Sequence, residues 1–151
     1  MMKKKIQKTY QDHGFGFPVT LLNVPMTAVR GEWVPMINQK ELQERVLEAL
    51  VLKHSRLSGS EVKFIRQFSK MTLEQFAERF DVTHPAVLKW ERTKNQGTGM
   101  SWTTEKDIRL FALNILEPKA KRFVVVYEQL THVALEKHEA IKIDLEKMSA
   151  A

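Results

Sequence analysis

The sequence predicts a mainly α fold with a small N-terminal β-hairpin and an extra C-terminal helix. Three observations lead to this class. Helix-capping signals, in which Asn, Ser or Thr is followed three residues later by Glu or Gln, begin three segments, at Asn38, Ser58 and Thr72. Apolar residues recur at helical spacing after each signal. Within residues 15–37, β-branched and aromatic residues flank a turn signal instead, which is typical of a hairpin.

The composition excludes several classes of protein. With 151 residues and 43% hydrophobic content, the chain can bury a core without disulfides or metal ions. It has no cysteine, which excludes a disulfide framework and cysteine-ligated zinc. It has no run of about 18 apolar residues, and Gly and Pro interrupt its first apolar stretch, so we expect a cytoplasmic protein with no membrane partner. The net charge of +6 suits a polyanionic partner.

Residues 1–14 are polar and charged without a period, which predicts a disordered basic arm. This arm could lie along phosphates or could simply be solvated, and its composition favours the second interpretation. Its lysines are Lys3, Lys4, Lys5 and Lys8. Residues 15–57 are predicted to form a hairpin, with its turn at Arg30-Gly31, and then a linking helix capped by Asn38.

Residues 58–117 are predicted to be a domain of short helices. Ser58 and Thr72 each begin a helix. Thr83 caps the next helix and places Pro85 in its first turn, where a missing N–H costs little.

Residues 118–151 are predicted to be a C-terminal helical extension. Within them, residues 122–130 contain FVVVY, which alone would suit a strand. The surrounding Lys- and Glu-rich sequence has helical spacing and favours a helix for these residues as well.

The segment TLEQFAERFDVTHPAVLKWERTKNQ, residues 72–96, has the spacing of a helix-turn-helix. Two helices that cross at a steep angle need a small side chain at their closest approach, and Ala77 supplies it. Val82 in the turn and Val87 in the second helix should fill the space between the helices. The side chain of Trp90 should point into the core. We therefore interpret these four residues as packing residues.

The same segment resembles the helix-turn-helix of the phage-repressor (Cro/C1, or Xre) family. The match covers residues 58–116 and implies a phage-repressor-like bundle. The matching residues are Thr72, Ala77, Val82, Thr83, Val87, Trp90, Glu91 and Arg92. Three positions depart from the family's pattern: Leu73 stands where many relatives have Gln, and Asp81 and Thr93 each replace a common Gly. Asp tolerates a left-handed backbone better than most residues do.

More loosely, the order of the parts resembles MqsA-type antitoxins. Those proteins join a small β-containing N-terminal domain through a linking helix to a repressor-like DNA-binding domain. Their N-terminal domains usually hold zinc with cysteines, and this chain has none. We therefore expect no metal and no other cofactor. The resemblance implies a toxin protein as a partner.

In the Cro/C1 family the third helix enters the major groove of DNA, and its first residues reach base edges. By this resemblance, the candidates for base contacts are His84, Pro85, Ala86 and Lys89. The candidates for phosphate contacts are Thr72, Gln75, Arg92, Lys94 and Asn95. Two of the base-contact candidates also have a structural interpretation. His84 could help to cap its own helix, and Lys89 could be a solvated helix residue.

These expectations lead to a sequence-specific, DNA-binding transcriptional repressor that acts as a homodimer on a palindromic operator. By the second resemblance, it is also the antitoxin of a type II toxin–antitoxin pair that autoregulates its operon. The alternative is a protein-interaction module that binds a toxin or another partner without specific DNA binding. No enzyme activity is expected. The motif GFGF precedes a proline and is not a phosphate-binding loop, and the five histidines lack metal-ligand spacing.

Overall fold

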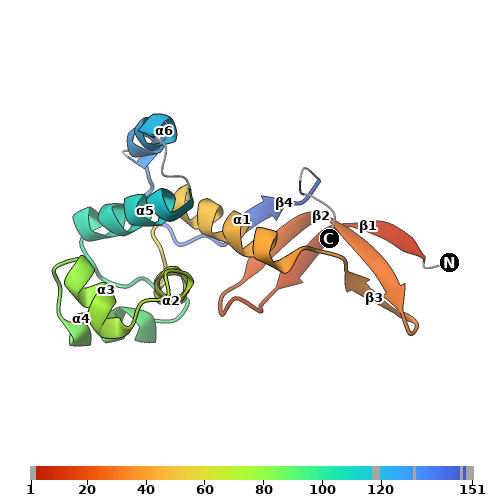
Figure 1. Cartoon of the computed structure of the whole chain (residues 1–151), viewed down its shortest axis with the longest axis horizontal. Helices are drawn as coiled ribbons and strands as arrows, with labels where there is room; N and C mark the ends of the chain where they lie inside the picture. Colours follow the sequence, from red (N-terminus) through yellow and green to blue (C-terminus); the bar gives the residue numbers. More distant parts are fainter. Residues whose placement is uncertain (1–2, 117–119, 131, 147, 149–151) are drawn as a thin grey trace. The chain divides into compact units, whose positions relative to one another are not determined.

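The computed structural model describes residues 3–116, 120–130, 132–146 and 148. The chain forms two compact units (Figure 1). One unit contains the residues up to Ala49 together with those from Ala140 onward, and the other is Leu50–Glu139. The second unit is therefore inserted, in sequence, between the two parts of the first.

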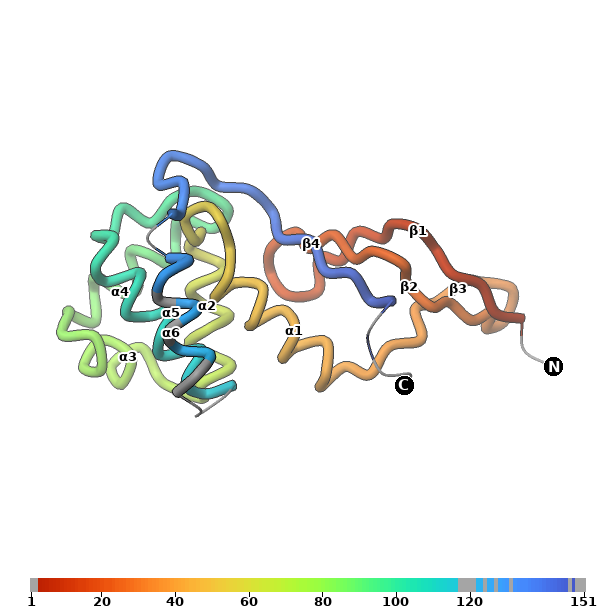
Figure 2. The backbone as a smooth tube through the Cα atoms, turned by 90° about the horizontal axis from the view of Figure 1, so that it is seen from above, coloured from red at the N-terminus to blue at the C-terminus, as the bar shows by residue number. Residues whose placement is uncertain are grey.

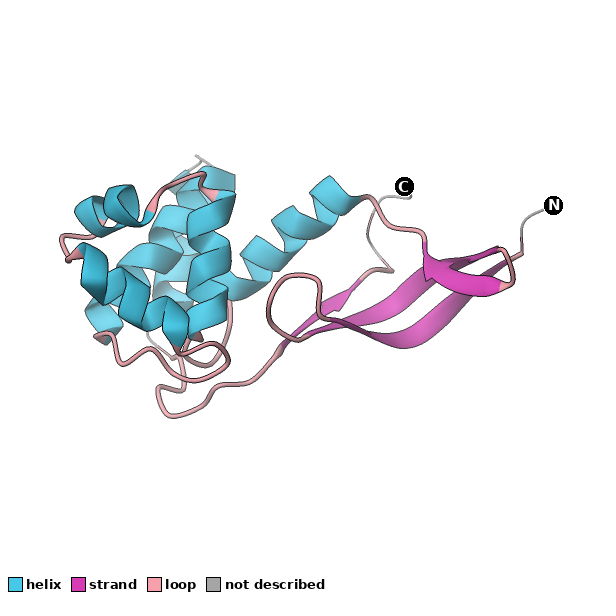
Figure 3. Ribbon diagram, turned by 90° about the horizontal axis from the view of Figure 1, so that it is seen from below, coloured by secondary structure: helices cyan, strands magenta, loops and turns pink. Residues whose placement is uncertain are grey.

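The first unit is built on a four-stranded mixed sheet (Figure 3). Its central strand β2 (Val19–Val29) pairs antiparallel with β1 (Lys4–Asp12) along one side. Along the other side, β2 pairs antiparallel with β3 (Glu32–Pro35) and parallel with β4 (Ile141–Asp144). The last strand of the chain therefore lies beside a strand near its beginning.

The fold is thus mixed α/β, and the prediction of a mainly α fold was wrong. Residues 4–12 are not a disordered arm, because they form β1 and pair with β2. Residues 118–151 are not helical throughout, because residues 141–144 form β4. In both cases, pairing with β2 decides the structure of a segment whose own composition points elsewhere, and for β4 this partner is far away in sequence.

The hairpin prediction is confirmed. Strands β2 and β3 pair in the register Val29↔Glu32, with Arg30 and Gly31 between them. Both turn residues have positive φ, 51° for Arg30 and 82° for Gly31, which is the backbone of a two-residue type I′ turn. The core of this unit combines side chains from the sheet and from α1 (Gln39–Val51). Its buried residues include Val19, Leu21, Val24, Met26, Leu42, Val46, Leu47, Ile141 and Ile143.

The second unit is helical (Figure 2). Its helices are α2 (Gly59–Phe68), α3 (Leu73–Arg79), α4 (His84–Arg92), α5 (Trp102–Leu116) and α6 (Ala120–Leu130). The predicted capping boxes at Ser58 and Thr72, the Thr83 cap and the helix over residues 122–130 are confirmed. Its core includes Val62, Ile65, Phe76, Phe80, Val87, Ile108, Ala112, Leu113 and Leu130.

A strap after α6, residues 132–139, runs parallel to the segment that leads into α2, with a bridge between Ser55 and Ala134. The N–H of Ala134 donates to the carbonyl of His54 at 2.8 Å, and the N–H of Arg56 donates to the carbonyl of Lys137 at 2.8 Å. The N–H of Glu139 donates to Ser55 Oγ at 2.9 Å. These bonds fix the strap before the chain continues into β4.

Candidate nucleic-acid interface

Helix α3 begins at a reciprocal capping box. Thr72 Oγ1 accepts a hydrogen bond from the N–H of Gln75 at 3.1 Å, and Gln75 Oε1 accepts one from the N–H of Thr72 at 2.9 Å. Both residues are exposed, and both are predicted phosphate contacts. The side-chain oxygen of Gln75 serves the cap, and its amide nitrogen is the group that can donate to a phosphate.

The turn between α3 and α4 has a defined backbone. Asp81 has a φ of 54°, in the left-handed region expected for a residue at the usual glycine position. Its N–H donates to the carbonyl of Glu78 at 3.3 Å, and the N–H of Val82 donates to that of Ala77 at 2.9 Å. This pair of bonds is a Schellman motif, which ends α3 and redirects the chain within residues 80–83.

Helix α4 begins directly after this turn. Thr83 Oγ1 accepts from the N–H of Ala86 at 3.2 Å, which satisfies one of the donors at the start of the helix. Pro85 lies in the first turn, where no intrahelical acceptor is available for an N–H. The exposed proline therefore does not disturb the helix.

The inner face of the two helices matches the expected packing for three of four residues. Ala77, Val87 and Trp90 are buried, with 3%, 0% and 7% of their surface exposed. Val82 is half-buried, so it fills the space beside the turn only in part.

The outer face of α4 carries the predicted base-contact residues. His84, Pro85 and Lys89 are exposed, and Ala86 is half-buried. His84, Pro85 and Ala86 form the first turn of the helix, where N–H groups also favour negative charge, and Lys89 lies in its last turn. The face therefore offers one cation, one imidazole and two small apolar groups to a ligand outside the protein.

The C-terminal end of α4 is held by α2. Arg66 Nε donates to Glu91 Oε2 at 2.6 Å, and Arg66 Nη2 donates to Glu91 Oε1 at 2.9 Å. Gly59, the first residue of α2, approaches α4 so closely that an added Cβ would lie 2.1 Å from the carbonyl oxygen of Trp90. The Arg66–Glu91 ion pair and the close backbone approach of Gly59 thus hold α4 on the side that faces α2.

Of the other predicted phosphate contacts, Arg92 ends α4, and Lys94 and Asn95 lie in the ordered turn after it. Arg92, Lys94 and Asn95 are all exposed. Lys94 has a φ of 53°, and its carbonyl accepts from the N–H of Ser60 at 2.9 Å. The backbone that carries these side chains is therefore tied to the start of α2.

Carboxylates lie close to this surface as well. His84 Nδ1 is 4.0 Å from Glu74 Oε1, and both side chains are well exposed. Glu78 and Asp81 are exposed on the same helix and turn. These carboxylates repel phosphate. For a polyanion to bind, the attraction from the cations of α4 and of the turn after it must exceed that repulsion.

A buried ionic network in the same unit was missed from the sequence. Glu105 accepts from Arg56 Nε at 2.8 Å and from Arg109 Nη2 at 2.7 Å, and Lys53 Nζ donates to Glu61 Oε1 at 2.7 Å. Glu105 and Arg109 are fully buried. Burial lowers the pKa of Arg109, and the adjacent Glu105 opposes that shift. The i, i+4 spacing of these two residues is equally typical of a solvated helix surface, so it gave no signal.

Arg109 also donates to the carbonyls of Lys53 and Ser55, and the N–H of Leu57 donates to Glu105. The network therefore fixes the segment between α1 and α2, on which the capping box at Ser58 depends. Its role is to hold α2, and α2 in turn holds α4.

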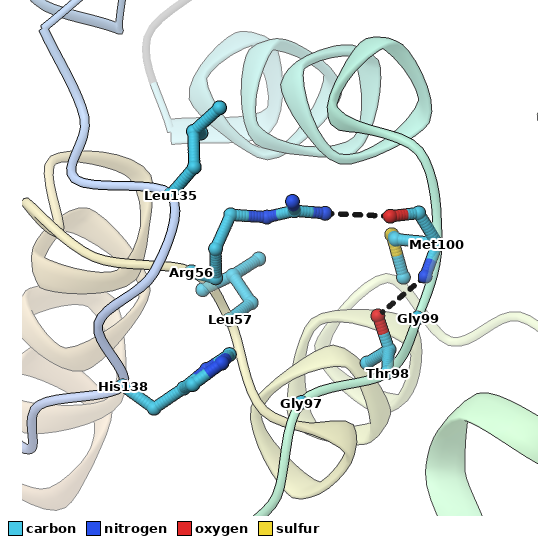
Figure 4. Close-up of a pocket in the computed structure, with 8 residues that line it drawn as sticks. All are labelled: Arg56, Leu57, Gly97, Thr98, Gly99, Met100, Leu135 and His138. Atoms are coloured by element: carbon cyan, nitrogen blue, oxygen red, sulfur yellow. Dashed lines mark hydrogen bonds between the residues drawn. The ribbon is translucent and has the colours of Figure 1, made fainter.

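A small cavity of about 170 Å³ lies beside this network (Figure 4). Figure 4 shows Arg56 directed toward the carbonyl of Met100, which accepts from Arg56 Nη2 at 2.7 Å. The cavity is lined by Arg56, Leu57, Gly97, Thr98, Gly99, Met100, Leu135 and His138. An added Cβ on Gly97 would lie 2.8 Å from the His138 ring, so the strap closes tightly on the loop after α4.

The described residues contain no group of three or more His, Asp or Glu side chains that could hold a metal ion. None of their helices combines the length and apolarity needed to cross a bilayer.

No protein-family model, curated protein or solved structure matches the chain.

Proposed function

We propose that this chain is a sequence-specific DNA-binding protein that represses transcription. One observation carries the proposal: α3 and α4 are joined by a short capped turn, and the second helix presents His84, Pro85, Ala86 and Lys89 outward. An α-helix fits the major groove, where each base pair presents a distinct pattern of donors and acceptors. The resemblance of residues 72–96 to the Cro/C1 family supports the same role.

In this proposal, Lys89 donates to a guanine O6 or N7, and His84 contacts a base or the neighbouring backbone. The thymine methyl group is the natural partner of Pro85 and Ala86. Thr72, Gln75, Arg92, Lys94 and Asn95 contact phosphates and set the register of α4. The protein acts in the cytoplasm, without a cofactor and without catalysis.

The proposed active form is a homodimer on a palindromic operator. One helix reads only a few base pairs, so useful specificity requires two copies of α4 in successive major grooves, about 34 Å apart. Repression follows if the operator overlaps a promoter, because the bound dimer then excludes the polymerase.

The test is selection of an operator from random DNA, followed by fluorescence anisotropy with the selected duplex and a scrambled one. We expect tight binding to the selected duplex and at least a thousand-fold weaker binding to the scrambled one at physiological salt, on the order of typical specificity ratios. Equal affinity for both duplexes would contradict the proposal.

The separate sheet unit favours a second activity, in which the chain is an antitoxin that binds a toxin and represses its own operon. The α/β unit of β1–β4 and α1 is not needed to build the helix-turn-helix, so it is available for a protein partner. Co-purification with the product of an adjacent small gene tests this activity. If that product is neither toxic nor bound, the antitoxin role is wrong and the repressor role is unaffected.

The alternative is a protein-interaction module without specific DNA binding. The exposed Glu74, Glu78 and Asp81 favour it, because they lie on α3 and its turn, where a DNA-binding surface would be expected to carry few carboxylates. The anisotropy experiment above also decides this alternative.

A further inference from the structure

Positive charge is concentrated in the first strands of the sheet unit, whereas the rest of that unit carries about as many carboxylates as cations. Residues 3–35 contain five cations, Lys3, Lys4, Lys5, Lys8 and Arg30, and two carboxylates, Asp12 and Glu32. They therefore hold +3 of the chain's net charge of +6 in less than a quarter of its length. From Lys3 to Gln11 there is no carboxylate at all.

The lysines lie on an edge strand. Strand β1 pairs with β2 on one side, and no other strand in the described part of the chain pairs with it. Lys4, Lys5 and Lys8 are all exposed. Because a strand advances about 3.3 Å per residue, Lys4 and Lys8 are about 13 Å apart along the edge.

The backbone of the edge strand β1 is held in place by its pairing with β2. The register pairs Lys4 with Thr27 and Lys5 with Met26, and the carbonyl of Lys3 accepts from the N–H of Ala28 at 3.0 Å. Lys5 Nζ lies 4.4 Å from the centre of the Trp33 ring, a cation–π contact that restrains this side chain. Because the backbone that carries the three lysines is already ordered, binding costs less conformational entropy than ordering a disordered arm would.

We infer that this basic edge, Lys4, Lys5 and Lys8 of β1, binds the phosphate backbone of duplex DNA. Each DNA strand carries one charge per about 3.4 Å of helix axis, so a row of about 13 Å meets several phosphates. The choice of DNA as the polyanion rests on the proposed function. The contact is independent of sequence, so it adds affinity and salt dependence and leaves base discrimination to α4.

Lysines on an edge strand have another known use, since their charge prevents two edges from pairing. The two roles predict different results. A protective role predicts that neutral variants self-associate while their DNA binding stays unchanged. A phosphate-binding role predicts that the salt dependence of DNA binding falls.

The test compares the triple variant K4Q/K5Q/K8Q with the charge-matched control K40Q/R45Q/K142Q. Lys40 and Lys142 are exposed and Arg45 is half-buried, and all three belong to the same unit outside β1. Binding to a long mixed-sequence duplex is measured by fluorescence anisotropy over a series of KCl concentrations. Thermal unfolding and light scattering verify the fold and the oligomeric state of each variant.

We expect the slope of log K against log salt to become shallower by about 2–3 for the β1 variant, since each lost phosphate contact is worth about 0.9. The control should change it by less than about 1. Equal slopes for the two variants would overturn the inference, as would self-association of the β1 variant with an unchanged slope.

The proposed function is judged separately, from the preference of the wild-type chain for its selected operator over a scrambled duplex. If that preference exists and the slopes of the two variants are equal, only the inference fails. If the slopes differ and no preference exists, only sequence-specific recognition fails. A wild-type chain that binds no duplex overturns both.

Discussion

Arg66 on α2 and Glu91 on α4 form a two-point ion pair, with N–O distances of 2.6 and 2.9 Å. Arg66 Nη1 also donates to the carbonyl of Met71 at 3.0 Å, so one guanidinium joins α2, the loop before α3 and α4. The two side chains are 12% and 7% exposed. Glu91 therefore supports α4 from its inner side, while His84 and Lys89 face outward.

Replacing Arg66 by Met should lower the free energy of unfolding by about 2–4 kcal/mol, because it leaves the Glu91 carboxylate nearly buried without its partner. Urea unfolding measures the loss. The double variant Arg66→Met/Glu91→Leu should recover part of it, since both charges are then absent. The exposed Lys63→Met on the same helix is the control. A loss below about 1 kcal/mol for Arg66→Met would show that the pair contributes no more than a surface ion pair does.

Glu105→Gln should destabilise the helical unit by about 3–5 kcal/mol, because the buried Arg109 then lacks its carboxylate and Arg56 loses an acceptor. The neighbouring Asp107 is exposed on the same helix, so Asp107→Asn should change stability by less than about 0.5 kcal/mol. Denaturant unfolding of both variants provides the comparison. Similar small losses in the two variants would mean that the network tolerates a neutral amide at its centre.

Asp81→Gly should raise stability by about 0.5–1 kcal/mol, because glycine adopts the left-handed backbone at this turn without the penalty that a Cβ brings. Glu78→Gly, inside α3, should lower stability by about 1 kcal/mol for the opposite reason. Thermal unfolding of the pair separates the two effects. Destabilisation by Asp81→Gly would indicate that the carboxylate makes a contribution that outweighs its backbone strain.

Lys89→Ala and Lys94→Ala should affect DNA binding in different ways. The loss of Lys89 should cost about 1–3 kcal/mol on the operator and relax discrimination at one base pair. The loss of Lys94 should lower the affinity for all DNA sequences alike and make the slope of log K against log salt shallower by about 1. Anisotropy with single-base operator variants measures both. A uniform loss in both variants would place Lys89 on a phosphate.

Local signals in the sequence predicted local structure well. Ser58, Thr72 and Thr83 cap their helices with the expected partners, because a cap depends only on residues within one turn. The left-handed backbone of Asp81 follows from its place at the end of a helix, three residues before the next one. The burial of Val87 and Trp90 was predicted from the spacing of the helix-turn-helix motif, which also lies within a short segment.

Long-range pairing was not visible in the sequence. The lysine-rich residues of β1 resemble a solvated tail, and only β2 beside them makes them a strand. In β4, Ile141 and Ile143 alternate with exposed residues, but Ile141, Leu145 and Met148 also fit a helical period. The parallel register Val19↔Ile141 joins residues more than a hundred positions apart, so no local window contains it.

The place of β4 has a consequence for biosynthesis. Its partner β2 leaves the ribosome early, and β4 emerges only after all of residues 50–139. The helix-turn-helix can thus fold on the growing chain while the sheet still lacks a strand. Any partner that recognises the completed sheet must wait until β4 has been synthesised, whereas contacts made by α4 are available earlier.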